Sequence, residues 1–258
     1  MKLGCICGSY NRTFDSGALN LIGFLRKCAT ELQVQGVELQ DIHFPQTRST
    51  YLQMIRRMAK DLNLAIIGVA VHNDFGRLDP TLRQSEVTKV KQWVEIAEQM
   101  GASFVRVLAG FPEGKSEDRW PAMIASFREA AEFAGHVGIR LGFENHNHGG
   151  FTPTAAEYLR ILREVNSPAL FPLLDTGGFT DGWASVRQVI PIAEHVHAKF
   201  WELKPDGSDA KVDYDTIIPA LRQAGYRGWV TFEYETPQAE DTGIPLALAY
   251  LKKTIAAV

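Results

Sequence analysis

Residues 195 to 235 read HVHAKFWELKPDGSDAKVDYDTIIPALRQAGYRGWVTFEYE. Two apolar runs of strand length, at 195 to 200 and 229 to 235, stand on either side of an amphipathic segment at 213 to 223. A strand, a helix and a second strand in this order are typical of a parallel βαβ unit. The stretch therefore predicts two parallel strands that carry polar and charged residues toward their carboxyl ends.

The same alternation runs through the whole chain, and we count eight rounds of it. The predicted strands are 3 to 9, 36 to 40, 64 to 72, 103 to 109, 139 to 144, 170 to 175, 195 to 200 and 229 to 235. The predicted helices lie near 17 to 33, 49 to 62, 81 to 100, 117 to 136, 154 to 165, 183 to 191, 213 to 223 and 244 to 256. Eight βα units in a chain of 258 residues favour the α/β fold class and a single closed (β/α)8 TIM barrel, which typically needs about 250 residues. An open doubly wound sheet is the alternative.

One domain is expected to cover residues 1 to 258. No Pro/Ser-rich linker, composition shift or low-complexity tract divides the chain. At this length, with 45% hydrophobic residues, roughly three quarters of the unfolded surface can be buried. The chain can therefore build one large core.

Charge and apolar patterning exclude several classes of partner. The formal net charge is −3, with 27 basic and 30 acidic residues and no long run of either sign, so we expect no nucleic acid partner. No stretch approaches the ~20 apolar residues of a membrane span, and no signal-length apolar region follows Met1, so we expect no membrane association. Three cysteines indicate a reducing compartment, so we expect a cytoplasmic protein with Cys5 and Cys7 packed inside. The sequence leaves the oligomeric state open, and a homo-oligomer is compatible with it.

Four successive strands end in side chains that can bind a metal ion. These side chains are Glu144, Asp175, His197 and Glu233. Because active sites of such barrels form at the carboxyl ends of the strands, we expect the four to converge at one mouth. Taken singly, each carboxylate has the alternative of a helix cap or a solvated rim residue.

Taken together, the four side chains predict a bound divalent cation. Three carboxylates at the edge of a dry core repel one another, and a cation offsets that repulsion. Three oxygen ligands and one imidazole suit Mn²⁺ best, then Mg²⁺ or Co²⁺, and they suit a structural Zn²⁺ site less, although Zn²⁺ remains compatible. Coordination positions would be left open for adjacent oxygens of a substrate.

The sequence resembles the sugar phosphate isomerase/epimerase group of xylose isomerase-like barrels. The resemblance rests on GVEL at 36 to 39, ENH at 144 to 146, DTG at 175 to 177, the H-x-K of His197 and Lys199, and GYRGWVTFEYE at 225 to 235. It implies a metal held by Glu144, Asp175, His197 and Glu233, with Glu144 and Glu233 also acting as an acid/base pair at the reacting carbon.

The chain departs from this group's pattern after the sixth predicted strand. Many members read DTGN there, whereas this chain has Gly178, so the contacts of an asparagine are missing. The endonuclease branch carries D-x-x-H after strand six and D-x-H after strand seven, and both motifs are absent at those places. The D-x-H spacing at 41 to 43 falls on the wrong strand. An AP endonuclease is therefore disfavoured.

Further candidates surround the four ligands. We expect His146, His72, Lys199 and Trp201 to contact a substrate, and His148 shares a side with Glu144 if the strand stays extended. For the histidines the alternative is an ordinary loop or lumen position, for Lys199 a structural partner of a carboxylate, and for Trp201 packing under the rim.

Two charged residues lie within predicted strands rather than at their ends. Glu38 and Arg106 are expected to form a mutual ion pair inside the barrel. Such a pair would be structural and would leave the chemistry to the strand ends.

The sequence favours an isomerase or epimerase of a small carbohydrate, such as a ketose or an inosose. In this hypothesis one glutamate removes a proton next to a carbonyl, the metal stabilises the enediolate, and the second glutamate returns the proton. A lyase or dehydratase using the same site is the first alternative, and a non-catalytic sugar-binding barrel is the second. The loop at 204 to 211 is not a recognisable phosphate cradle, so a phosphorylated substrate is not implied.

Overall fold

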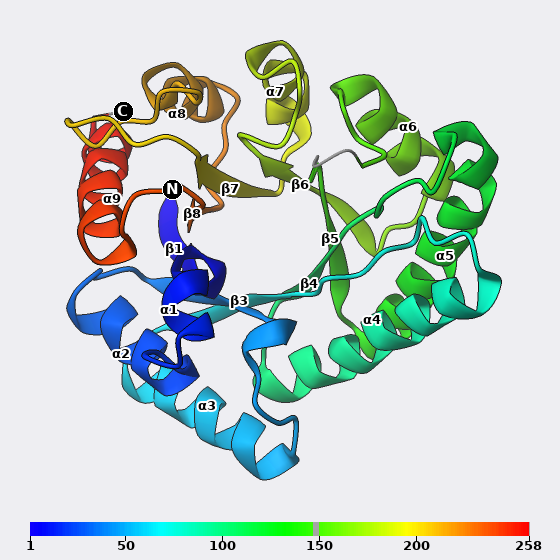
Figure 1. Cartoon of the computed structure of the whole chain (residues 1–258), viewed down its shortest axis with the longest axis horizontal. Helices are drawn as coiled ribbons and strands as arrows, with labels where there is room; N and C mark the ends of the chain where they lie inside the picture. The colour runs from blue at the N-terminus through cyan, green and yellow to red at the C-terminus, as the bar shows by residue number, and fades with distance from the viewer. Residues whose placement is uncertain (147–149, 258) are drawn as a thin grey trace.

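Eight parallel strands form a closed barrel in the computed structural model, which describes residues 1–146 and 150–257 (Figure 1). The strands are β1 (Lys2–Ile6), β2 (Gly36–Gln40), β3 (Ala65–Ala70), β4 (Phe104–Val107), β5 (Arg140–Glu144), β6 (Leu170–Asp175), β7 (His195–Phe200) and β8 (Trp229–Tyr234). Each pairs with the next along the chain, and β1 pairs with β8, where Cys5 lies opposite Phe232. The predicted (β/α)8 barrel is confirmed, and the open sheet is excluded.

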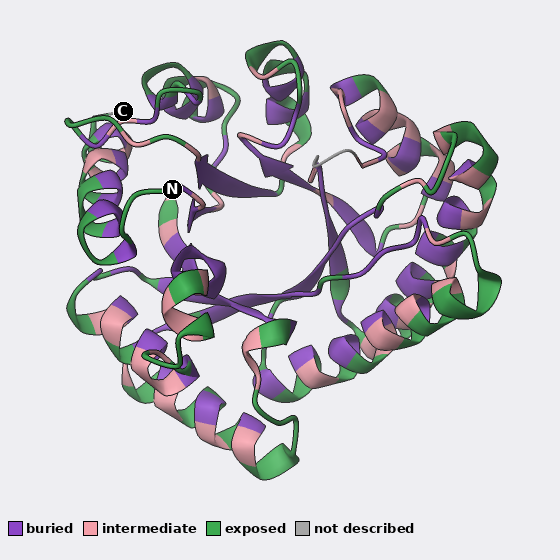
Figure 2. Ribbon diagram, in the orientation of Figure 1, coloured by how far each residue is buried: buried purple, intermediate pink, exposed green. Residues whose placement is uncertain are grey.

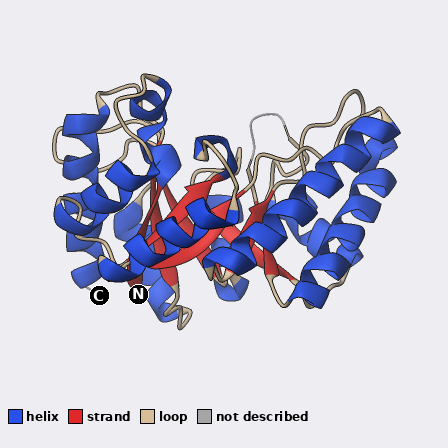
Figure 3. Cartoon of the chain, turned by 90° about the horizontal axis from the view of Figure 1, so that it is seen from below, coloured by secondary structure: helices blue, strands red, loops and turns tan. Residues whose placement is uncertain are grey.

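The helices surround the strands, as Figures 1 and 3 show. They are α1 (Asn11–Asp15), α2 (Leu21–Thr30), α3 (Ser49–Asp61), α4 (Pro80–Met100), α5 (Ser116–Val137), α6 (Ala155–Val165), α7 (Trp183–Val189), α8 (Tyr214–Gln223) and α9 (Glu240–Ala256). Short 3-10 helices cover Cys7–Tyr10, Asp41–His43 and Ile190–Ile192. Figure 2 shows buried strands and helices whose outward faces are exposed, as expected for a sheet covered by a ring of helices. Among the described residues, no helix is long and apolar enough to span a bilayer.

Local chemistry fixes the ends of several helices. Asp79 caps α4 by accepting hydrogen bonds from Thr81 N at 2.7 Å and Leu82 N at 3.1 Å, and Pro80 occupies the first turn. Gly101 closes α4 with φ +71°, a left-handed conformation that glycine adopts without a steric penalty. Asp213 caps α8 by accepting a hydrogen bond from Thr216 N at 3.2 Å.

The first βα connection differs from the prediction. The strand expected to continue to residue 9 ends at Ile6, and a 3-10 turn and α1 follow it. Helix α2 is correspondingly shorter than the segment from 17 to 33 and begins after Asn20, whose side chain accepts from Gly23 N at 2.9 Å. Burial explains the early turn, since Cys7 packs against β2, where its sulfur accepts from Gln40 N at 3.0 Å. Cys5 and Cys7 are buried and unpaired, as predicted.

The inside of the barrel changes from apolar to charged toward the mouth. A separate apolar cluster contains Ile67, Phe104, Phe171 and Leu173. Polar side chains follow it along the same strands, because every second residue of a strand points to the same side. On β7, His195 lies with its ring centroid 4.8 Å from that of Phe104, and His197 and Lys199 follow two and four residues later. The apolar floor keeps these polar groups away from water.

Candidate metal centre

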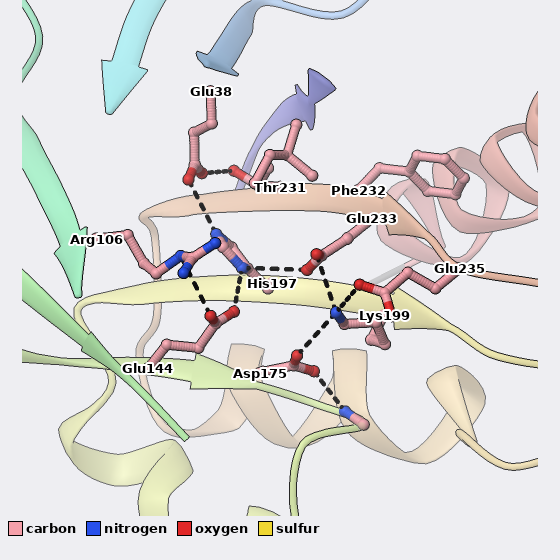
Figure 4. A network of polar contacts seen from close by, with 12 residues as sticks. Glu38, Arg106, Glu144, Asp175, His197, Lys199, Thr231, Phe232, Glu233 and Glu235 are labelled. Carbon is pink, nitrogen blue, oxygen red and sulfur yellow. Dashed lines mark hydrogen bonds and ion pairs between the residues drawn. The ribbon is translucent and has the colours of Figure 1, made fainter. Parts of the chain in front are cut away.

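The ends of β5, β6, β7 and β8 bring the four predicted ligands to one region of the barrel (Figure 4). Glu144, Asp175, His197 and Glu233 are all buried, with at most 4% of their surface exposed. Charged groups withdrawn from water this far are costly unless they are paired or bind an ion. The arrangement therefore requires compensating positive charge.

His197 lies between two glutamates. Its Nδ1 is 2.6 Å from Glu144 Oε1 and 3.3 Å from Glu233 Oε2. Three ligand atoms, one from each of these residues, lie within 4.8 Å of one another. An imidazole nitrogen and two carboxylate oxygens that converge in this way form one face of a divalent cation site.

Two oxygens at this place have no hydrogen-bond partner among the described residues. They are Asp175 Oδ2 and Glu233 Oε2, and both are buried. Buried carboxylate oxygens are normally bonded, and an ion is one reason for an exception. The converging donors of Glu144, His197 and Glu233 fit a divalent cation. Asp175 is not part of this group of three, so its role as a fourth ligand stays a prediction.

The ammonium group of Lys199 brings positive charge to the site. Its Nζ lies 2.9 Å from Glu233 Oε1, 2.8 Å from Glu235 Oε1 and 3.4 Å from Asp175 Oδ2. The side chain is buried, and β7 and β8 place it beside its glutamate partners through the register of Lys199 opposite Glu233. The alternative that Lys199 pairs with carboxylates is confirmed, while its contact with a substrate stays a prediction.

The carboxylates of the site differ in their pKa. Burial tends to raise the pKa of Glu144, but Arg106 and His197 outweigh it and lower this pKa to about 2. For Glu233, Lys199 and His197 likewise outweigh burial and hold its pKa well below the ordinary value. For Asp175, burial prevails over Lys199, and its pKa is raised to about 7. The nearby cationic side chains therefore do not fully offset the cost of ionising the buried Asp175 carboxyl.

Asn145, the residue after β5, forms a clamp of two hydrogen bonds that holds the backbone at Asp175. Asn145 Oδ1 accepts from Asp175 N at 2.7 Å, and Asn145 Nδ2 donates to Asp175 O at 2.9 Å. Gly178 packs against this clamp so closely that a Cβ there would lie 2.1 Å from Asn145 O. The glycine that departs from the family pattern is thus required by the position of Asn145.

Comparison with known proteins places this arrangement in a family. The sequence matches the family model described as xylose isomerase-like TIM barrel over residues 27–254. This chain belongs to that family. The resemblance inferred from its strand-end motifs is thereby confirmed.

Individual relatives of this xylose isomerase-like barrel are distant. It is 26% identical over 180 residues to the L-ribulose 3-epimerase of Methylomonas sp. (strain DH-1), covering 66% of this chain and 63% of that one. It is 24% identical over 161 residues to the inosose dehydratase of Erwinia tasmaniensis, covering 52% and 53%. The chain thus spans less than two thirds of either relative. The crystal structure of the 3-keto-D-glucoside 4-epimerase from E. coli superposes with a TM-score of 0.77 at 16% identity, over 98% of this chain and 99% of that one, which shows a shared fold.

The predicted ion pair between Glu38 and Arg106 is wrong in its partners. Arg106 Nε lies 3.3 Å from Glu144 Oε2, and the guanidinium also donates to Val71 O at 3.1 Å. Glu38 instead bonds to His195 and His197. The opposite charges of Glu38 and Arg106 suggested that they pair with each other, whereas each pairs with other residues of the site.

The other residues predicted to contact a substrate are His72, Trp201 and His146, and each has contacts within the protein. His72 Nδ1 is 2.7 Å from Asp41 Oδ1, and its side chain is 40% exposed. Trp201 Nε1 donates to Gly177 O at 3.1 Å, and Lys199 Nζ lies 5.2 Å from the centroid of its ring. His146 is half-buried, with its ring centroid 6.3 Å from that of Phe111. Their contacts with a substrate stay predictions, and His148 lies outside the described residues.

Sequence reasoning gave no role to several participants in the site, among them His195, which bonds to Glu38. Asn145 stood within the ENH motif but was given no role, and Glu235 and Thr231 stood on the last strand without one. Alternation along β8 was the available signal, because Thr231 and Glu233 fall on one side of the strand and Glu235, the residue after its end, continues the same spacing.

Proposed function

We propose that this chain is a divalent-metal-dependent isomerase or epimerase of a small carbohydrate. The observation that carries the proposal is the pair of buried glutamates, Glu144 and Glu233, on either side of His197 Nδ1. Two carboxylates that approach one place from different strands can act on opposite sides of a bound carbon atom. Membership of the xylose isomerase-like family and the similarity to an L-ribulose 3-epimerase support the proposal.

The glutamates divide the proton transfer between them. One accepts a proton from the carbon next to a carbonyl and later releases it to water, and the other takes up a proton from water and delivers it to that carbon. Each transfer contributes typically 10²–10⁴-fold to the rate. A cation held by the four ligands supplies electrostatic stabilisation of the oxyanion that proton removal creates. We propose Mn²⁺ as this ion, because three carboxylates and one imidazole suit it.

The buried cations contribute to the same chemistry. Arg106 contacts Glu144, and Lys199 contacts Glu233, so each glutamate has its own cationic neighbour. Both are therefore held as carboxylates, the form that can accept a proton. Lys199 also lies close enough to Trp201 for both to line the same side of a substrate.

Proton exchange with solvent tests the proposed function. Purified protein with Mn²⁺ is incubated with a panel of ketoses and inososes in D₂O, and deuterium uptake at carbon is followed by NMR. Wild-type protein is expected to exchange a proton of its substrate, and Glu144→Gln and Glu233→Gln are each expected to lose at least 100-fold in exchange. Glu194→Gln is the matched control, since this exposed residue pairs with Arg140 at the other end of the barrel. Full exchange in either active-site variant contradicts the pair mechanism.

A dehydratase is the second candidate, supported by the similarity to an inosose dehydratase. Loss of a β-hydroxyl after proton removal uses the same two glutamates. Mass spectrometry of the product separates the candidates, because an epimerase conserves the mass of the substrate and a dehydratase releases water.

We further propose a cytoplasmic location. All three cysteines of the chain are free and buried, which suits a reducing compartment. Fractionation of the native organism with a cytoplasmic marker checks this, and recovery with secreted protein contradicts it.

A further inference from the structure

Glu38 accepts three hydrogen bonds inside the barrel. It lies on β2, is fully buried, and faces residues of β7 and β8 across the interior. Its Oε1 accepts from Thr231 Oγ1 at 2.5 Å, and its Oε2 accepts from His197 Nε2 at 2.9 Å (Figure 4). Its Oε1 also accepts from His195 Nε2 at 2.6 Å. This is more bonding than a simple ion pair provides.

The contact with Glu38 places a hydrogen on Nε2 of His197. An ionised carboxylate only accepts hydrogen bonds, so His197 Nε2 must donate. The other nitrogen, Nδ1, faces Glu144 and Glu233, and in this geometry it also donates, to Glu144 Oε1 at 2.6 Å. Binding of an ion at Nδ1 therefore requires only that nitrogen to lose its hydrogen, while Nε2 keeps its hydrogen toward Glu38. A carboxylate behind a metal-binding histidine orients the ring in this way in many metal sites.

We propose that Glu38 is a positioning residue of the metal centre, which holds His197 with hydrogen on Nε2 and directs Nδ1 to the ion. The inference rests on the metal centre of the proposed function. Glu38 touches neither substrate nor ion and acts through His197. His195 and Thr231 complete the bonding of the carboxylate and keep it from rotating away.

A separate ion held by Glu38 itself is the competing interpretation. Glu38, His195 and His197 each offer a ligand atom within 4.8 Å of the others. Thr231 Oγ1 already donates to the same oxygen that bonds His195, and the ring of His195 rests against Phe104 of the apolar cluster. Hydrogen bonds therefore account for this group, and titration of the protein with Mn²⁺ should reveal one ion per chain.

Metal affinity provides the first test. In Glu38→Gln, the amide can donate to His197 Nε2 and favours hydrogen on Nδ1, where the ion should bind. Isothermal titration with Mn²⁺ is expected to show 10- to 100-fold weaker binding than wild type. Glu194→Gln, at the exposed rim of the opposite end, is expected to bind Mn²⁺ as wild type does. Equal affinity in Glu38→Gln and wild type overturns the inference, as do two ions per wild-type chain.

The hydrogen on His197 provides a test that needs no variant at Glu38. Long-range ¹H–¹⁵N NMR of ¹⁵N-labelled wild-type protein with Zn²⁺ distinguishes protonated, metal-bound and free ring nitrogens, and loss of a signal in His197→Gln assigns it. Protonated Nε2 with metal-bound Nδ1 supports the inference, and the reverse overturns it even if Glu38→Gln does not fold. Failure of wild-type protein to bind any divalent cation overturns the metal centre and this inference together. Tight Mn²⁺ binding that is equal in wild type and Glu38→Gln overturns this inference alone.

Discussion

Lys199 is the buried cation that contacts three carboxylates of the site. Its ammonium contacts Asp175, Glu233 and Glu235, and removing it leaves these carboxylates without their nearest cation. Breaking a buried ion pair by deleting one partner costs about 3–5 kcal/mol. We expect Lys199→Met to lose about this much unfolding free energy in EDTA, as measured by urea denaturation, and to regain part of it with Mn²⁺. Unchanged stability in EDTA would contradict the assigned contacts.

Asp175 makes stability depend on pH in the opposite direction from Glu144. Its pKa in the folded protein, about 7, exceeds the unfolded value near 3.9, so the folded state binds more protons between these limits. Its contribution to stability is complete below pH 4 and is lost as the pH rises to about 7. Glu144, with a folded pKa of about 2, instead contributes above its unfolded pKa and loses this contribution in acid.

Replacing Asp175 tests this direction. In EDTA at pH 7, we expect Asp175→Asn to be more stable than wild type, because the amide cannot ionise. The difference should shrink as the pH falls toward 4, and one pKa unit corresponds to about 1.4 kcal/mol. Thermal unfolding at several pH values measures it. A variant that is less stable than wild type at pH 7 in EDTA would show that the carboxylate is compensated by other means.

The loop between β6 and α7 is the element that fixes Asp175. A Cβ at residue 178 would meet the backbone of Asn145, so Gly178→Ala must displace either the loop or the clamp. We expect a loss of about 1–3 kcal/mol in unfolding free energy and weaker Mn²⁺ binding. Gly135→Ala is the matched control, since its Cβ would meet Ala169 at an ordinary 3.5 Å within α5, and it should stabilise the protein by about 0.5–1 kcal/mol. Normal Mn²⁺ affinity in Gly178→Ala would separate the loop from the metal centre.

The strands could be predicted from sequence because each has a local signature. The predicted β5, β6 and β7 agree with the structure to within one residue at each end, since buried parallel strands read as short apolar runs. The α1 region was missed, because the turn after Ile6 depends on packing against β2 rather than on a local breaker. Helix α9 similarly begins at Glu240, before the expected residue 244, where the Glu240 carboxylate accepts from Arg12 N and Thr13 N.

In the site too, some features follow from local sequence and others depend on how the whole barrel closes. Glu144, Asp175, His197 and Glu233 were predictable because a barrel gathers the carboxyl ends of its strands, whatever the helices between them. The partner of Glu38 was not predictable, since β2 and β7 are distant in sequence and meet only when the barrel closes. Barrel closure thus supplies the contacts, such as that of Glu38 with His197, that surround the four predicted ligands.

We propose that a single divalent cation binds Glu144, Asp175, His197 and Glu233, and anomalous diffraction from crystals grown with Mn²⁺ would locate it. We expect one anomalous peak per chain, bonded to His197 Nδ1 and to an oxygen of each carboxylate, with Glu38 behind Nε2. A peak bonded to Glu38 and His195, or crystals saturated with Mn²⁺ that show no peak at the mouth of the barrel, would contradict this metal centre.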